Sequence, residues 1–127
     1  MLNPLHLILL PEKLAICQAD PSELEPNDFM FASFWSVTRT STELSIVLPQ
    51  DHVRPEWVCE PDWRALQVVG PLPFEMVGVV ANLSQALAEA EISLFVLSTY
   101  ETDYILLKEQ NVAGARQALL AQGHIWE

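Results

Sequence analysis

Glycine, cysteine and basic residues are all scarce in this chain, and each shortage excludes a class of protein. Four glycines in 127 residues are too few for a dinucleotide-binding fingerprint, and no G-x-x-x-x-G-K-S/T phosphate-binding loop is present. Six basic against seventeen acidic residues give a formal net charge of −11. Because such a surface repels phosphate backbones and anionic lipids, we expect neither nucleic acid nor membrane as a partner.

Long hydrophobic runs are also missing, although half of the residues are hydrophobic. No run approaches the roughly 20 apolar residues that a membrane-spanning helix needs. The run Leu5–Leu10 lies between two prolines with no basic residue before it, so it predicts a strand and not a signal peptide. The composition therefore indicates one compact unit or two very small ones with a substantial core.

The two cysteines, Cys17 and Cys59, form neither a CxxC pair nor a metal-ligand pattern. With no secretory signal, the expected compartment is the cytoplasm, where thiols stay reduced. We therefore expect two reduced, mostly buried thiols. A Cys17–Cys59 disulfide is the alternative.

Motifs of catalysis are absent as well. Ser45 lies in no GxSxG elbow, the three histidines have no partnered nucleophile, and no HExxH or similar spacing suggests zinc. Glu101 and Asp103 share one face of a predicted strand, but nothing in the sequence would separate their pKa values. We expect no enzyme activity, no cofactor and no metal.

The second half of the chain alternates between strand and helix patterns. The predicted elements are a strand at Ala65–Val69, a helix from Gly78, strands at Ile92–Leu97 and Asp103–Lys108, a helix capped by Asn111 and stopped by Gly123, and an edge strand at His124–Trp126. Between the two middle strands lies a polar tip, residues 98–103, whose hydroxyls and carboxylates suit a small polar ligand. The alternative is an ordinary solvated hairpin loop.

The first half predicts strands without a helix. We expect a hairpin of two strands at Leu5–Leu10 and Leu14–Gln18, followed by an acidic loop at Asp20–Asp28. A second strand pair is expected at Phe31–Arg39 and Leu44–Leu48. A connector at Arg54–Trp63 follows.

Three segments resemble the ACT family, in its tandem CASTOR-type form. They are RTSTELSIVLP (Arg39–Pro49), VVGPLPFEMVGVVANLSQALAEAEISLFVLSTYETDYILLKE (Val68–Glu109) and ALLAQGH (Ala118–His124). The resemblance implies an α+β, ferredoxin-like βαββαβ sandwich in two tandem modules: a degenerate ACT-like module at 1–63 and an ACT domain at 64–127. It also implies regulatory binding of a small molecule, most often an amino acid, at an interface between modules or subunits, and a homodimer.

The resemblance places ligand contacts at Thr99, Tyr100 and Asp103, and the residues themselves suggest how an amino acid would be held. The loop before Gly78 leads into a helix, whose amino end favours a carboxylate, and Asp103 suits an ammonium. Alternatives stay open for three residues: Asp103 as a turn residue, Gly78 as a simple helix start and Phe74 as a core plug. The candidate ligand-binding residues are Ser45, Ile46, Gly70, Leu72, Phe74, Gly78, Ser98, Thr99, Tyr100 and Asp103.

We expect such a protein to signal through a separate partner protein or through its own oligomerisation. The rival hypothesis is a ligand-free interaction module whose exposed surfaces dock another protein.

Overall fold

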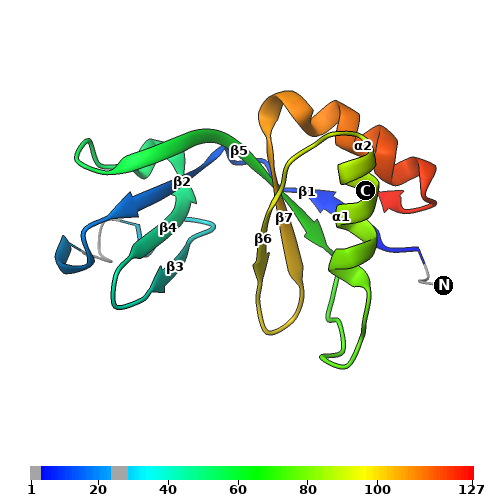
Figure 1. The fold of residues 1–127 in the computed structure, drawn as a ribbon, viewed down its shortest axis with the longest axis horizontal. Coiled ribbons are helices and arrows are strands. Elements are labelled where there is room, and N and C mark those ends of the chain that lie inside the picture. Colours follow the sequence, from blue (N-terminus) through cyan, green and yellow to red (C-terminus); the bar gives the residue numbers. More distant parts are fainter. Residues whose placement is uncertain (1–3, 24–28) are drawn as a thin grey trace. The chain divides into compact units, whose positions relative to one another are not determined.

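The computed structural model describes residues 4–23 and 29–127, which form two compact units (Figure 1). We call residues 64–127 together with 4–11 the helical unit, and the described part of 12–63 the strand unit. The expected boundary between residues 63 and 64 coincides with one junction of the two units. Residues 4–11 differ from the expected division, because their strand pairs inside the helical unit. Neither α-helix in the described residues is long and apolar enough to cross a lipid bilayer.

The helical unit is built on a sheet in the order β6-β7-β5-β1-β8. The strands are β1 His6–Leu9, the last part of β5 Val58–Val68, β6 Phe95–Ser98, β7 Asp103–Lys108 and β8 Ile125–Trp126. Strand β1 runs antiparallel to β5, with Leu7 opposite Val68, and parallel to β8. Strand β1 is therefore enclosed between β5 from the middle of the sequence and β8 from its other end.

Two helices, α1 Val79–Glu89 and α2 Val112–Ala121, cover this sheet. Helix α1 buries its predicted apolar stripe, including Leu83 and Leu87, against inward-facing strand residues such as Leu66 and Ile105. The alternating strand, helix, strand, strand, helix, strand order predicted for residues 64–127 is confirmed.

The ends of the helices follow local backbone geometry. Gly78 precedes α1 with φ +86°, and Gly123 follows α2 with φ +89°, a region that favours glycine. Asn111 occupies the expected N-cap position of α2, but it does not cap the helix through its side chain. This residue ends a 3₁₀ turn, Glu109–Asn111, and its side chain makes no capping hydrogen bond.

The strand unit is an antiparallel sheet in the order β3-β4-β2-β5. Its strands are β2 Leu14–Ala19, β3 Ser36–Arg39, β4 Leu44–Pro49 and the first part of β5, and no α-helix occurs in its described residues. The core of this unit includes Phe29, Ile46 and Trp57. Short 3₁₀ turns occur at Pro21–Glu23 and Gln50–His52. The predicted acidic loop therefore contains a turn, and residues 24–28 of that prediction lie outside the described residues.

Two predictions for the first half are wrong. Strand β1 pairs with β5 and β8, whereas β2 pairs with β4 and β5, so the two strands do not form the expected hairpin. The expected connector Arg54–Trp63 contains the start of the long strand β5 at Val58. Exposed residues dominate this part of the strand, which hides the alternation that marks a half-buried strand.

The cysteines correct a third expectation. Cys17 of β2 lies directly opposite Cys59 of β5, with 4.1 Å between the Cα atoms, and the two form a disulfide instead of the expected reduced thiols. The expected reduced state followed from the cellular compartment, which contains no information on strand register. That register places the two sulfur atoms side by side.

Candidate functional site

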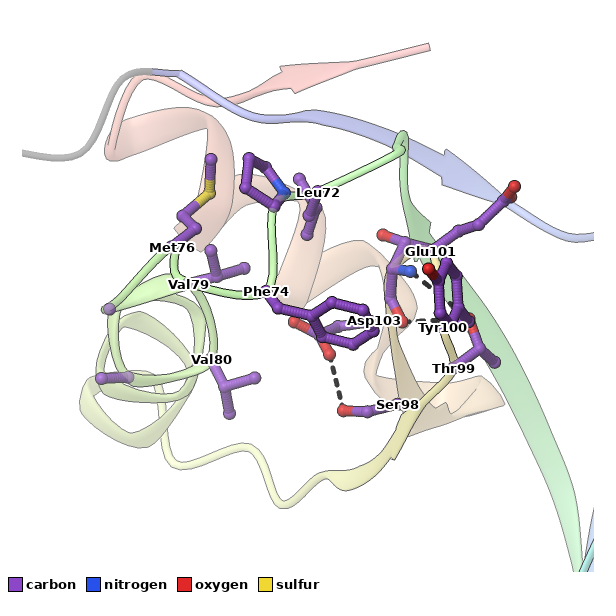
Figure 2. A pocket seen from close by; sticks show the side chains of 14 residues that line it. Leu72, Phe74, Met76, Val79, Val80, Ser98, Thr99, Tyr100, Glu101 and Asp103 are labelled. Carbon is purple, nitrogen blue, oxygen red and sulfur yellow. Dashed lines mark hydrogen bonds between the residues drawn. The ribbon is translucent and has the colours of Figure 1, made fainter.

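A cavity of about 350 Å³ opens in the helical unit, and every residue that lines it belongs to this unit (Figure 2). Its walls are the proline loop (residues 69–78), the first turn of α1 and the β6–β7 tip (residues 98–103). The lining residues are Leu72, Pro73, Phe74, Met76, Gly78, Val79, Val80, Ala81, Ser98, Thr99, Tyr100, Glu101, Thr102 and Asp103.

Direct hydrogen bonds hold the proline loop against the β6–β7 tip. The backbone N–H of Leu72 donates to the carbonyl oxygen of Glu101 at 2.7 Å, and the buried Thr102 hydroxyl donates to the carbonyl oxygen of Val68. Gly70 permits this close approach, because a Cβ atom at its position would lie 2.9 Å from the Glu101 carbonyl oxygen. These contacts fix two walls of the cavity relative to each other.

The carboxylate of Asp103 is held across the strand pair. Asp103 lies opposite Ser98 in the β6–β7 register, and the Ser98 hydroxyl donates to Asp103 Oδ1 at 2.6 Å (Figure 2). Thr99 and Thr102 close the turn instead, through the Thr99 N–H to the Thr102 carbonyl at 2.8 Å and through the Thr99 hydroxyl. The interpretation of Asp103 as a turn residue that bonds its own backbone is therefore wrong. The Thr99 hydroxyl, in contrast, makes its hydrogen bonds within the turn.

The opposite wall carries the start of α1. Val79, Val80 and Ala81 occupy its first turn, where backbone N–H groups have no acceptor within the helix. Gly78 supplies no side-chain cap, and no acidic residue stands in the first turn. This wall therefore presents the positive end of the helix dipole to the cavity.

Apolar side chains complete the lining. The rings of Phe74 and Tyr100 meet edge to face with centroids 4.9 Å apart, which joins the proline loop to the β6–β7 tip. Phe74 is 73% exposed, so the interpretation of this residue as a core plug is wrong. No lysine, arginine or histidine lines the cavity.

A buried histidine supports α1 just beyond its first turn. His124 Nδ1 accepts a hydrogen bond from the Leu5 backbone N–H at 3.1 Å, so the ring proton is on Nε2, which donates to Asn82 Oδ1 at 2.7 Å. Burial disfavours the charged imidazolium and lowers the pKa of His124. The neutral ring therefore connects β1, α1 and the segment after α2.

Most of the residues predicted for ligand binding line this cavity, and three do not. Gly70 lies beside it and sets the approach of loop to tip. Ser45 and Ile46 lie in β4 of the strand unit, where Ile46 is fully buried in the core. For the residues that do line the cavity, ligand contact stays a prediction.

The prediction included the amino end of α1 through its backbone amides, but it did not name the lining residues Val80 and Ala81. The sequence does indicate these two residues. They follow a glycine that starts a helix, so they lie in the first turn, whose amide groups have no acceptor within the helix. Met76 was missed too, because a lone methionine in a loop carries no pattern.

A second cavity, of about 480 Å³, lies in the strand unit. Its charged lining residues include Lys13, Asp51 and His52, all of which are exposed. Water competes with a ligand for such groups, so this cavity is the weaker candidate. Within the described residues, no group of three or more His, Cys, Asp or Glu side chains is placed to hold a metal ion.

Two family profiles match the sequence and together span most of it. The profile described as ACT domain matches residues 58–121. A profile for a family of N-terminal domains matches residues 12–62. The change from one profile to the other at residues 58–62 lies close to the junction of the two units at residue 63, and strands β1 and β8 lie outside both profiles.

Individual relatives agree with these profiles. The crystal structure of protein Atu0741 from Agobacterium tumefaciens superimposes with a TM-score of 0.91 at 28% identity, covering 99% of this chain and 94% of that one. Human CASTOR3P is 27% identical over 122 residues, or 80% of this chain and 72% of that protein. The human cytosolic arginine sensor for mTORC1 subunit 1 is 34% identical over 58 residues, which is 45% of this chain but only 18% of the sensor. The resemblance to CASTOR-type proteins is thereby confirmed.

Proposed function

Because the chain belongs to the ACT domain family, we propose that its helical unit binds a small amino acid as a regulatory ligand in the cavity between α1 and the β6–β7 tip. The observation that carries the proposal is the pairing of opposite electrostatic features across one cavity. The half-buried Asp103 carboxylate forms one wall, and the start of α1 forms the other.

A zwitterion matches this arrangement group by group. Its ammonium donates to the Asp103 carboxylate, which retains acceptor capacity beyond its bond from Ser98. Its carboxylate accepts from the first-turn amides of α1. A simple amine or a simple acid would satisfy one wall and leave the other unpaired, which costs binding free energy.

The proposal is tested by thermal shift with the twenty amino acids, followed by calorimetric titration of those that raise the melting temperature. A ligand that binds only the folded state adds about 2.7 kcal/mol at one hundred times its Kd. An amino-acid amide and the corresponding carboxylic acid without its amine serve as single-headed controls. Both should bind more weakly than the parent amino acid.

The decisive variant is Asp103→Asn. The asparagine oxygen still accepts from Ser98, so the tip keeps its geometry while the cavity loses its charge. Hydrogen bonds to charged groups contribute about 1.5–3 kcal/mol, so we expect affinity to fall roughly tenfold to a hundredfold with little change in apo melting temperature. Glu75→Gln is the matched control, because Glu75 is an exposed acid of the proline loop that does not line the cavity, and this variant should bind normally.

Equal affinity in the Asp103→Asn and wild-type proteins would refute the role of Asp103. Absence of a shift with every amino acid would favour the ligand-free docking module instead. The exposed side chains of Phe74, Val77 and Tyr100, at 73%, 84% and 81% exposure, would then be its contact surface.

We further propose that the bound state is read by a partner protein or by a second copy of the chain, in the cytosol as for the arginine sensor. Strand β8 is the last strand of its sheet and Ile125 is exposed, so an edge is available for pairing between copies. Sedimentation equilibrium with and without ligand measures this assembly. A monomer under both conditions would refute the homodimer.

A further inference from the structure

We infer that the ligand is an amino acid with an uncharged, apolar side chain, and that the cavity discriminates against the cationic amino acids. This inference rests on the proposed function, since it concerns the side chain of the same ligand. The supporting observation is the unequal distribution of charge and apolar surface around the cavity.

Of the carboxylates in residues 4–23 and 29–127, Asp103 alone is directed into the cavity. In Figure 2 the Asp103 carboxylate is directed towards Ser98 and the Phe74 ring, whereas the Glu101 side chain extends away from both. Glu101 is exposed and contributes to the tip through its backbone carbonyl, which accepts from the Leu72 N–H. If Asp103 takes the ligand ammonium, no second acidic side chain remains inside for a guanidinium or a side-chain amine.

The rest of the lining is largely hydrocarbon. Leu72, Phe74 and Met76 extend from the proline loop, and Val80 extends from α1. A ligand anchored between Asp103 and the start of α1 has its remaining atoms against these side chains. A branched aliphatic side chain placed there buries apolar surface, whereas a cationic one finds no free carboxylate to pair with.

The cavity is large enough for any single amino acid, so the preference follows from the chemistry of its lining and not from its size. About 350 Å³ holds a molecule as small as leucine or valine. We therefore expect that a substitution in the apolar lining changes which ligand side chain is preferred. It should not change the binding of the ligand's ammonium and carboxylate groups.

The test is calorimetric titration of the full chain with L-leucine, L-alanine and L-arginine. We expect leucine to bind at least about tenfold tighter than alanine, because lost methylene groups in a hydrophobic pocket cost about tenfold or more. We expect arginine to bind at least about tenfold more weakly than leucine. Glu75→Gln removes a carboxylate from the proline loop outside the cavity lining and should leave all three affinities unchanged.

Val80→Ala supplies the second measurement. It should reduce leucine affinity by about tenfold while leaving alanine affinity nearly unchanged. Val77→Ala is the matched control, since Val77 is 84% exposed and does not line the cavity. Both variants are checked for an unchanged apo melting temperature.

The outcomes separate this inference from the proposed function. Arginine binding as tightly as leucine, and weakened by Glu101→Gln, would overturn the apolar ligand class while leaving amino-acid binding intact. Equal loss of leucine and alanine affinity in Val80→Ala would also overturn it. If no amino acid binds at all, the proposed function fails and this inference fails with it.

Discussion

Opening the Cys17–Cys59 crosslink should destabilise the strand unit by an amount set by the length of the loop that it closes. The two cysteines are 42 residues apart in sequence. Loop-closure entropy for that length corresponds to about 4 kcal/mol at 25 °C, because the reduced unfolded chain gains conformations that the crosslinked chain lacks. This amount is a large share of the typical stability of about 5–15 kcal/mol for a small domain.

The assay compares urea unfolding of the oxidised protein with that of the protein in a dithiol reductant. Three of the four tryptophans, Trp35, Trp57 and Trp63, lie in the strand unit, so their fluorescence reports mainly on that unit. Amide hydrogen exchange of β2 and β7 then locates the effect. We expect the amides of β2 to lose protection and those of β7 to keep it.

Identical urea midpoints for the two forms would refute the loop-entropy argument. Titration of two free thiols in protein kept without reductant would refute the crosslink itself. The Cys17→Ala/Cys59→Ala variant serves as the control, since it should match the reduced protein and should not respond to the reductant.

Two further predictions concern single residues of the helical unit. Gly70→Ala should lower the free energy of unfolding by about 1–3 kcal/mol, because the new Cβ would lie 2.9 Å from the Glu101 carbonyl oxygen; thermal unfolding measures this loss. Gly114→Ala in α2 is the control and should be stabilising by about 0.5–1 kcal/mol, since its Cβ would make only an ordinary contact, and a destabilisation as large as that of Gly70→Ala would contradict the argument. Stability should fall as pH drops below about 6.5, the usual histidine pKa, because the pKa of His124 is lowered in the folded state and the unfolded chain takes up its proton first. This contribution is fully present above that pH and is lost as pH falls towards the folded pKa. The fall of the urea midpoint from pH 8 to pH 5 should therefore be smaller in His124→Gln, and an equal fall in both proteins would show that burial of His124 does not cause the pH dependence.

The helical unit was the easier part to predict because its elements have strong local patterns. The apolar spacing of Val79, Leu83 and Leu87 has a helical period, and Gly78 and Gly123 mark helix ends. The polar tip was also recognisable from sequence, because its hydroxyls and carboxylates interrupt two apolar strands. The opposition of Ser98 and Asp103 follows directly from a hairpin of that length.

Strand partners were not predictable from the same information. Local sequence shows that His6–Leu9 is a strand, but the choice between β2 and β5 as its neighbour depends on contacts tens of residues away. The first part of β5 was hidden for a different reason, since Pro61 and exposed acidic residues break its alternation. The disulfide was missed with it, because Cys59 lies in that part of the strand.

The position of β1 between β5 and β8 has a consequence for biosynthesis. Strand β1 must wait until Ile125–Trp126 has left the ribosome before their parallel pairing can form. The strand unit, being contiguous in sequence, can acquire its native pairing earlier. A fragment that begins at Arg64 would retain both helices but would lack β1, so β8 would lose the strand it pairs with. The helical unit therefore cannot be isolated by truncating the chain at one position.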